Sequence, residues 1–345
     1  MNSFSQTIIT WYAEHKRDLP WREINDPYLI WISEIILQQT KVAQGYNYYQ
    51  RFITHFPTYQ ALAMAEEEEV LKLWQGLGYY SRARNLHAAA KSIKEKFPTT
   101  YQELLRLKGV GEYTAAAISS FAYNEPHAVV DGNVYRVLSR YFGLSDPIDS
   151  TKGKKRFKEL AYTLLDVENP GLHNQSIMEF GALQCTPKAP RCEECPLADS
   201  CLALAQNLVT LLPIKEKKTK TRNRYLHYFY VVSGNAIYLQ QRKEKDIWQG
   251  LFEFPLIETD KKSNLHQLLT APLLTKELAD VKEPQLRIVV EDFKHVLSHQ
   301  IIYASLYELI LPANTEAFST YLRVNKNEAT KYPFSRLVEI LWNKV

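Results

Sequence analysis

The spacing of hydrophobic residues changes once along this chain. Up to about residue 210, apolar residues recur every three or four positions, as on the buried faces of helices. Beyond residue 225 they follow the pattern of strands. Helices are expected at 4–15, 31–40, 46–56, 66–74, 81–97, 100–107, from 112 onward, and at 134–142, 157–165 and 174–183.

The second part of the chain is predicted to mix strands and helix. Strands at 225–232 and 236–242 flank Ser233-Gly234-Asn235, which favours a hairpin. A long β-rich run is expected over 295–310, and a closing helix over 328–342. The fold class is therefore multidomain, with an all-α part followed by an α+β part.

A basic segment separates the two parts. It contains six Lys or Arg residues between Lys215 and Arg224 and a single acid, Glu216. We expect a helical domain at 1–212, a linker at 213–224 and an α+β domain at 225–345. The linker is a candidate binding segment for protein partners.

The amino-acid composition indicates the general class of protein. A hydrophobic share of 46% with 23% charged residues fits a soluble globular protein, and 345 residues exceed one ordinary core. No apolar run approaches the length of a membrane span, and the first ten residues lack a signal-peptide pattern. We expect a cytoplasmic monomer without membrane contact, nucleoid-associated if bacterial. The net charge of +4 is weak evidence for a polyanionic partner.

The segment 31–40 carries a carboxyl group on an otherwise apolar helix. Glu34 lies between Trp31 at i−3 and Leu37 at i+3. Burial among such neighbours raises the pKa of a carboxyl group. A structural glutamate held by an unseen partner explains the pattern equally, and it is the commoner case.

Asp131 is expected at the start of a helix, where its environment should affect the pKa in the opposite direction to that of Glu34. Helix N–H groups favour the ionised carboxylate, so its pKa should fall. Two carboxyls with pKa values pushed apart are typical of an acid paired with an anionic stabiliser. A plain helix cap is the alternative.

The four cysteines fall within one short segment, in the order Cys185-x6-Cys192-x2-Cys195-x5-Cys201. Clustered cysteines in a chain without an export signal indicate metal ligation rather than disulfides. The compact spacing suits an iron–sulfur cluster and zinc about equally.

Two glycines make a tight turn between expected helices at Gly109-Val110-Gly111. The second helix begins there, and its free backbone N–H groups can bind a phosphate. An ordinary helix–helix turn is the simpler interpretation.

Six motifs in this order resemble adenine DNA glycosylases of the MutY type, in the helix-hairpin-helix superfamily of base-excision enzymes. They are LPWR at 19–22, SEIILQQT at 33–40, GLGYY at 76–80, GVGEYTA at 109–115, VDGNV at 130–134 and the cysteine spacing. The resemblance is strong up to about residue 210 and weaker over 225–345. It implies a helix-hairpin-helix glycosylase domain followed by a Nudix-like domain.

The resemblance implies catalytic roles for four residues. Glu34 would protonate adenine N7, and Asp131 would stabilise the oxocarbenium sugar or trap it transiently. Asn133 would assist Asp131. Tyr113 stands where lyase-type relatives have a lysine, so base excision without strand cleavage is expected.

It also implies contacts with double-stranded DNA containing adenine opposite 8-oxoguanine or guanine. The family flips adenine out of the duplex. Gln39 and Tyr79 match residues that enter the helix at the lesion. The matches to the adenine pocket are Trp21, Arg22, Leu37 and Gln175.

The resemblance makes the cofactor a [4Fe–4S] cluster on the four cysteines, with Lys188 and Arg191 as candidate phosphate contacts. In the C-terminal part, 248–255 matches the Nudix-like domain, but the spaced glutamates of a Nudix catalytic box are absent. Ser298 and His299 match the 8-oxoguanine recognition loop. Leu297 stands where the family usually has phenylalanine, which puts the strength of lesion discrimination in question.

Two other functions fit parts of the same pattern. A sister glycosylase, acting on thymine in G·T mismatches or on oxidised pyrimidines, would share the helical part. A metal-bearing DNA-binding protein without activity would not need both Glu34 and Asp131.

Overall fold

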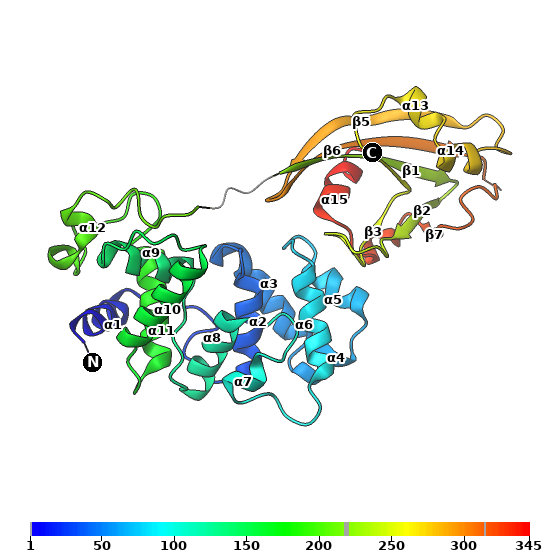
Figure 1. Ribbon diagram of the computed structural model, residues 1–345. Coiled ribbons are helices and arrows are strands. Elements are labelled where there is room, and N and C mark those ends of the chain that lie inside the picture. Colours follow the sequence, from blue (N-terminus) through cyan, green and yellow to red (C-terminus); the bar gives the residue numbers. More distant parts are fainter. Residues whose placement is uncertain (1, 217–220, 314) are drawn as a thin grey trace. The chain divides into compact units, whose positions relative to one another are not determined.

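The chain forms two compact units, which are described separately. In the computed structural model, residues 2–216, 221–313 and 315–345 are described (Figure 1). Unit 1 comprises Met1–Ala63 and Ala88–Lys218, and unit 2 comprises Met64–His87 and Thr219–Val345. No helix within the described ranges is long and apolar enough to cross a membrane.

Unit 1 is built from helices. They are α1 (Ser3–His15), α2 (Pro27–Leu37), α3 (Val42–His55), α4 (Tyr59–Met64), the end of α6 (Ser81–Ser92), α7 (Tyr101–Leu104), α8 (Glu112–Tyr123), α9 (Gly132–Tyr141), α10 (Thr151–Leu164), α11 (Pro170–Leu183), η1 (Ala198–Ser200) and α12 (Leu202–Ala205). The helical character predicted for this part is confirmed.

Side-chain caps fix where several of these helices begin. Asp26 accepts hydrogen bonds from the Tyr28 and Leu29 N–H groups at the start of α2. The predicted capping box of Thr100 and Glu103 is present at α7. A capped start fixes the direction in which each helix presents its side chains.

The helix α11 lies beside α8 and α9, which begin within two of the sequence motifs, GVGEYTA and VDGNV. It packs against α1, α8 and α9, while α2 packs against α3 and α8. A Cβ atom on Gly171 would lie 2.6 Å from the Ser120 carbonyl oxygen, and one on Gly181 would lie 2.7 Å from Asn133 Cβ. Glycine therefore lets α11 approach the end of α8 and the start of α9 closely.

Unit 2 is a mixed sheet with helices. The strands are β1 (Arg222–Ser233), β2 (Ala236–Gln241), β3 (Phe252–Glu253), β4 (Leu256–Thr259), β5 (Gln285–Val296), β6 (Gln300–Leu311) and β7 (Leu322–Asn325). The helices are α5 (Glu67–Trp74), most of α6, α13 (Leu265–Leu269), α14 (Pro272–Glu277), η2 (Ala329–Lys331) and α15 (Arg336–Trp342).

The sheet has the order β3-β2-β1-β6-β5, with β4 paired to β1 and β7 to β2. Strands β1 and β6 run parallel from Arg222 opposite Gln300 to Ser233 opposite Leu311, and the other strand pairs are antiparallel. The predicted hairpin between β1 and β2 is confirmed, with Gly234 at a φ of 58°. The α+β class of this part is confirmed as well.

One sequence prediction in unit 2 is confirmed and another is wrong. The run 295–310 is β-rich, as predicted, and contains the end of β5, a turn and most of β6. The turn closes through a 2.8 Å hydrogen bond from the Leu297 N–H to the Gln300 carbonyl. The expected helix over 328–342 is split into η2 and α15, since Pro333 lies between them and Ser335 caps α15.

Several helix ends also differ from the prediction. The helix α6 ends at Ser92 rather than at 97, and α3, α10 and α11 each begin earlier than their apolar pattern suggested. Pro170 starts α11, and Ser150 caps α10. The first turn of α10 is polar, so hydrophobic spacing did not mark it.

The segment 64–87 belongs to unit 2 although it lies within the predicted helical domain. Its side chains bond to the C-terminal part: Lys72 Nζ donates to the Tyr332 carbonyl at 3.1 Å, and Arg84 Nη1 to the Gln249 carbonyl at 2.6 Å. The proposed domain limits at 212 and 225 remain predictions. Residues 217–220 of the proposed linker lie outside the described residues.

Replacing Gly181 by alanine should destabilise unit 1 by roughly 1–3 kcal/mol, the usual cost of overpacking. The new methyl group would meet Asn133 Cβ at 2.7 Å and the Asn133 carbonyl at 3.0 Å. Urea-induced loss of helical circular dichroism measures the change. Gly132→Ala is the control, because its Cβ meets nothing within 4 Å. Equal midpoints for the two variants would contradict this account of α11.

Candidate functional site

Glu34 is buried on α2, with only 6% of its surface exposed. Its Oε2 accepts a 2.8 Å hydrogen bond from the Tyr113 hydroxyl on α8. Burial raises the pKa of Glu34, the hydrogen bond from Tyr113 and the charge of Arg22 lower it, and the charge of Asp131 raises it further. The predicted rise in the pKa of Glu34 is confirmed, because the effect of burial is larger than the lowering by Tyr113 and Arg22.

Tyr113 is the second residue of α8, and its hydroxyl reaches Glu34 on α2. Burial, followed by the negative charges of Glu34 and Asp131, raises its pKa well above the ordinary tyrosine value. The phenol is therefore neutral and serves as a hydrogen-bond donor to the Glu34 carboxyl. The helices α2, α8 and α9 thus bring three of the predicted catalytic residues together.

Asp131 caps α9, as predicted. Its Oδ1 accepts the backbone N–H groups of Asn133 at 2.9 Å and Val134 at 2.8 Å, and its Oδ2 accepts the Asn133 side-chain amide at 2.8 Å. The prediction of a lowered pKa is wrong. Burial raises the pKa of Asp131, and the hydrogen bonds from Val134 and Asn133 offset only part of that effect.

The two buried carboxyls still differ in which form their partners favour. Asp131 accepts three N–H donors, and each of them stabilises the ionised carboxylate. Glu34 accepts one hydroxyl on an apolar helix. The hydrogen-bond donors therefore favour the ionised form more strongly at Asp131 than at Glu34.

Arg136 connects this site to the cysteine segment, and its helical spacing from Asn133 was the one sequence signal that could have indicated it. Its Nη2 donates to Asn133 Oδ1 at 2.9 Å and to the Gly181 carbonyl at 2.6 Å. Its Nε donates to the Cys185 carbonyl at 2.7 Å. The Asn133 side chain, which donates to Asp131, is therefore linked through Arg136 to the backbone of Cys185.

The four cysteines line one small cavity of about 30 Å³ at the end of α11, as the prediction of a shared site requires. Within the described ranges, no three His, Cys, Asp or Glu side chains are arranged to hold a metal ion. Arg140 is buried on α9, and its Nη1 lies 3.4 Å from Cys185 Sγ and 2.7 Å from the Thr186 carbonyl. Four thiols around a cavity, with a guanidinium at one sulfur, suit an anionic iron–sulfur cluster.

The residues predicted to form the adenine pocket have different surroundings. Trp21 is buried, and its ring lies 5.1 Å from that of Tyr49 on α3. Arg22 lies beside the acid, since its charge lowers the pKa of Glu34, and its Nη2 is 3.9 Å from Glu179 Oε2.

Leu37 and Gln175 complete the predicted adenine pocket. Leu37 is the last residue of α2, which also carries Glu34. Gln175, on α11, accepts a 3.0 Å hydrogen bond from the Tyr12 hydroxyl. An interaction of these residues with adenine stays a prediction.

Backbone groups are exposed at two turns of unit 1. Gln39 is exposed just after α2 with a φ of 55°. Gly109 has a φ of 82°, and Gly111 begins α8; among the described residues no side chain caps this helix. Val110 is buried beneath the turn. The first N–H groups of α8 are thus available to an anion such as phosphate.

In unit 2, the remaining predicted residues meet at a pocket of about 580 Å³. Tyr79, Ser298 and His299 all line it. The Tyr79 hydroxyl lies 2.7 Å from Ser298 Oγ, although the two residues are 219 positions apart. Tyr79 is 42% exposed, and Arg82 lies under its ring at 5.6 Å. Aromatic and polar groups at one pocket can contact both a base face and a base edge.

The chain matches three protein families. Residues 32–162 match the HhH-GPD superfamily of base excision DNA repair proteins, and residues 227–344 match the NUDIX domain. Residues 185–201 match the iron–sulfur binding domain of endonuclease III, which begins and ends at the outer cysteines. The predicted fold class and iron–sulfur segment are confirmed.

Curated relatives match most of the chain. The adenine DNA glycosylase of Buchnera aphidicola subsp. Schizaphis graminum is 36% identical, over 86% of this chain and 84% of its own length. The adenine DNA glycosylase of Rattus norvegicus is 35% identical, over 93% of this chain and 73% of its own.

Solved structures match the helical part. A thermostable thymine-DNA glycosylase superimposes with a TM-score of 0.55 at 32% identity, covering 59% of this chain and 95% of that one. Endonuclease III, in a non-covalent complex with DNA, has a TM-score of 0.52 at 20% identity and the same coverage, which shows a shared fold. On the match to its curated relatives over most of both lengths, the chain belongs to the adenine DNA glycosylase family.

Proposed function

We propose that this chain is a monofunctional DNA glycosylase that removes adenine paired with 8-oxoguanine or guanine in double-stranded DNA. The observation that carries the proposal is the 2.8 Å hydrogen bond from Tyr113 to the buried Glu34 carboxyl. Asp131 is close enough for its charge to raise the pKa of that carboxyl. The names of the curated relatives support adenine as the base.

Glu34 is the general acid. Its raised pKa keeps a proton on the carboxyl at a pH where an exposed glutamate is ionised. Transfer of this proton to adenine N7 lets the bonding electrons of the C1′–N9 bond leave with the base. Trp21, Arg22, Leu37 and Gln175 hold the flipped adenine beside this acid.

Asp131 stabilises the sugar cation that remains. Its three N–H partners favour the ionised carboxylate, whose negative charge stabilises the positive charge that develops at C1′. Water then adds to C1′, and its proton leaves through the active-site carboxylates. Asn133 fixes the orientation of Asp131 through its amide.

The absence of an amine at position 113 makes the enzyme monofunctional. A lysine there would attack C1′ and form a Schiff base that leads to strand cleavage. Tyr113 is a neutral phenol that donates to Glu34. The product is an abasic site in an unbroken strand.

The duplex is held by backbone groups of unit 1 and read by side chains. The turn at Gly109, Val110 and Gly111 binds a phosphate at the start of α8. Gln39 and Tyr79 fill the space that adenine leaves, and Ser298 and His299 read the opposite 8-oxoguanine. Leu297 offers a smaller wedge than phenylalanine beside that base.

The cysteines hold a [4Fe–4S] cluster, which supplies no chemistry to the glycosidic bond and orders the loop around it. Lys188 and Arg191 are exposed on this loop and contact DNA phosphate. Arg136 ties the Cys185 backbone to Asn133, so an ordered loop also keeps Asp131 in place.

A duplex panel tests the proposed substrate. Single-turnover excision is measured on adenine opposite 8-oxoguanine, adenine opposite guanine, a G·T mismatch and thymine glycol, before and after alkali. We expect activity on the two adenine duplexes and strand breaks only after alkali. The similarity of the helical part to a thymine-DNA glycosylase makes G·T the relevant alternative. Activity on G·T alone would reject adenine, and breaks without alkali would reject the monofunctional mechanism.

Glu34→Gln should lower the excision rate at least about 100-fold, since the general acid is lost. The same change should stabilise the protein above the pKa of a free glutamate. Because the pKa of Glu34 is raised in the folded protein, the parent loses stability as the pH rises from the pKa of a free glutamate towards that of Glu34. The glutamine of the variant does not ionise, so the variant does not lose this stability. Melting temperatures at pH 4 and pH 8 measure this, with a difference expected only at the higher pH. A variant less stable than the parent at pH 8 would contradict the burial argument.

Purified protein should be brown and contain about four iron atoms per chain. Cys192→Ser removes one ligand of the proposed cluster, so iron content and colour should both fall. Metal analysis and visible absorption are the measurements. Stoichiometric zinc in a colourless protein would overturn the cluster.

A further inference from the structure

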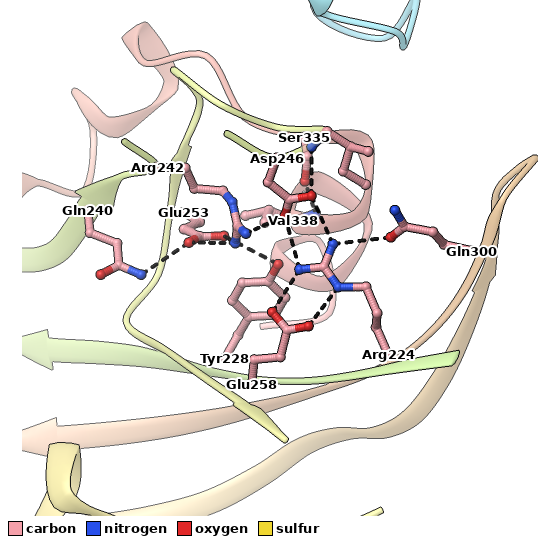
Figure 2. Close-up of polar contacts among 11 residues, drawn as sticks. Arg224, Tyr228, Gln240, Arg242, Asp246, Glu253, Glu258, Gln300, Ser335 and Val338 are labelled. Carbon is pink, nitrogen blue, oxygen red and sulfur yellow. Dashed lines mark hydrogen bonds and ion pairs between the residues drawn. The ribbon is translucent and has the colours of Figure 1, made fainter. Parts of the chain in front are cut away.

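Two chain segments that line the unit 2 pocket are joined by one buried arginine. The first segment contains Asp246 and the second is the turn 297–300 between β5 and β6. Arg224 extends from β1 and is only 7% exposed. Figure 2 shows its guanidinium between Asp246, Glu258 and Gln300.

The guanidinium is fully engaged by three side chains. Its Nε and Nη2 donate to the two carboxylate oxygens of Glu258, both at 2.7 Å. Its Nη1 donates to Asp246 Oδ1 and to Gln300 Oε1, each at 3.1 Å, and Nη2 lies 3.0 Å from Asp246 Oδ2. This planar fork fixes the directions of all three partners, which a lysine ammonium does not.

Gln300 transmits this constraint to the turn. It is 8% exposed, and its carbonyl accepts the Leu297 N–H at 2.8 Å, which closes the turn that presents Ser298 and His299. The His299 carbonyl accepts the Arg222 N–H at 3.2 Å. The side-chain bond to Arg224 therefore holds the base of the turn against β1.

Asp246 transmits the constraint to the other segment. Its Oδ1 accepts the Ile247 N–H at 2.7 Å, and its carbonyl accepts the Gln249 N–H at 3.2 Å. Arg242 also bonds to Asp246, with Nη2 at 2.6 Å from Oδ2, and to Glu253 through Nη1. Ile247 and Trp248, which follow Asp246, line the same pocket as the turn.

We propose that Arg224 is a positioning residue that fixes the turn 297–300, through Gln300, and the segment 246–249, through Asp246, in the spacing that discriminates 8-oxoguanine from guanine. This inference rests on the proposed function, because it assigns the discrimination to the pocket of Tyr79, Ser298 and His299. Arg224 itself is buried behind the pocket and does not touch the base. Displacement of a recognition group by about 1 Å is enough to lose most of its selectivity.

The network allows the turn to be released without removing a charge. Gln300→Met deletes the acceptor for Arg224 Nη1 and leaves the bonds to Glu258 and Asp246. Gln240→Met is a matched control, since Gln240 donates to Glu253 of the same network at 3.1 Å and does not line the pocket. Gln300→Glu keeps the acceptor and is the conservative rescue. Arg224→Lys keeps the charge but not the fork.

The experiment compares single-turnover excision of adenine opposite 8-oxoguanine and opposite guanine, with melting temperatures, for the full chain and the four variants. In Gln300→Met and Arg224→Lys we expect the ratio of the two rates to fall about tenfold, as for loss of a hydrogen bond to a charged group. The rate opposite guanine should stay within about twofold. Gln240→Met and Gln300→Glu should keep the parent ratio.

An unchanged ratio in folded Gln300→Met overturns the proposal, as does an equal fall of both rates. A fall of the ratio in Gln240→Met overturns it too, since general loosening of the network would then explain the effect. Parent protein that excises adenine without preference for 8-oxoguanine overturns this inference and leaves adenine excision standing. Parent protein inactive on both duplexes instead rejects the proposed function.

Discussion

The burial of one carboxyl group on α2 is the constraint on which the proposed chemistry depends. Glu34 lies on a helix that is apolar on nearly every side, and its carboxyl group accepts a hydrogen bond from the Tyr113 hydroxyl. Ionisation in that setting is costly, so the proton is retained. The start of α8 is therefore as important as α2, because it places the phenol. Gly181 of α11 matters for the same reason, since it allows close packing beside Asn133.

The two units treat buried charge in opposite ways. In unit 1, Glu34 has few partners and a raised pKa, which is suited to proton transfer. In unit 2, Arg224 has three polar partners around one guanidinium, and hydrogen bonding to Glu258 raises its pKa beyond the ordinary value. A charge paired so completely cannot move a proton, but it can hold segments of chain in place. Burying a charged group is costly in both units. In unit 1 the cost at Glu34 is largely uncompensated, which suits proton transfer. In unit 2 the partners of Arg224 compensate it, which suits positioning.

The sequence predicted local features better than distant ones. The buried face of α2, the cap at Asp131, the capping box at Thr100 and the hairpin at Gly234 all depend on residues within a few positions. The bond between Tyr79 and Ser298 joins residues 219 positions apart, and the grouping of 64–87 with the C-terminal part also brings distant segments of the chain together. Hydrophobic spacing carries no information on such pairs. Nor did it reveal Arg136, whose role depends on where the Asn133 amide and the Cys185 carbonyl meet.

The error over Asp131 has a physical lesson. A helix start stabilises a carboxylate, but the sequence did not show how deeply this start would be buried, and burial outweighs the three donors in setting the direction of the pKa. The measurement that tests the account most directly is the titration of both carboxyls by carbon NMR, in protein labelled at Glu and Asp side chains. The account predicts that Glu34 titrates well above an ordinary glutamate and that Asp131 loses its proton first. A Glu34 that ionises at or below its ordinary pKa would contradict the central claim.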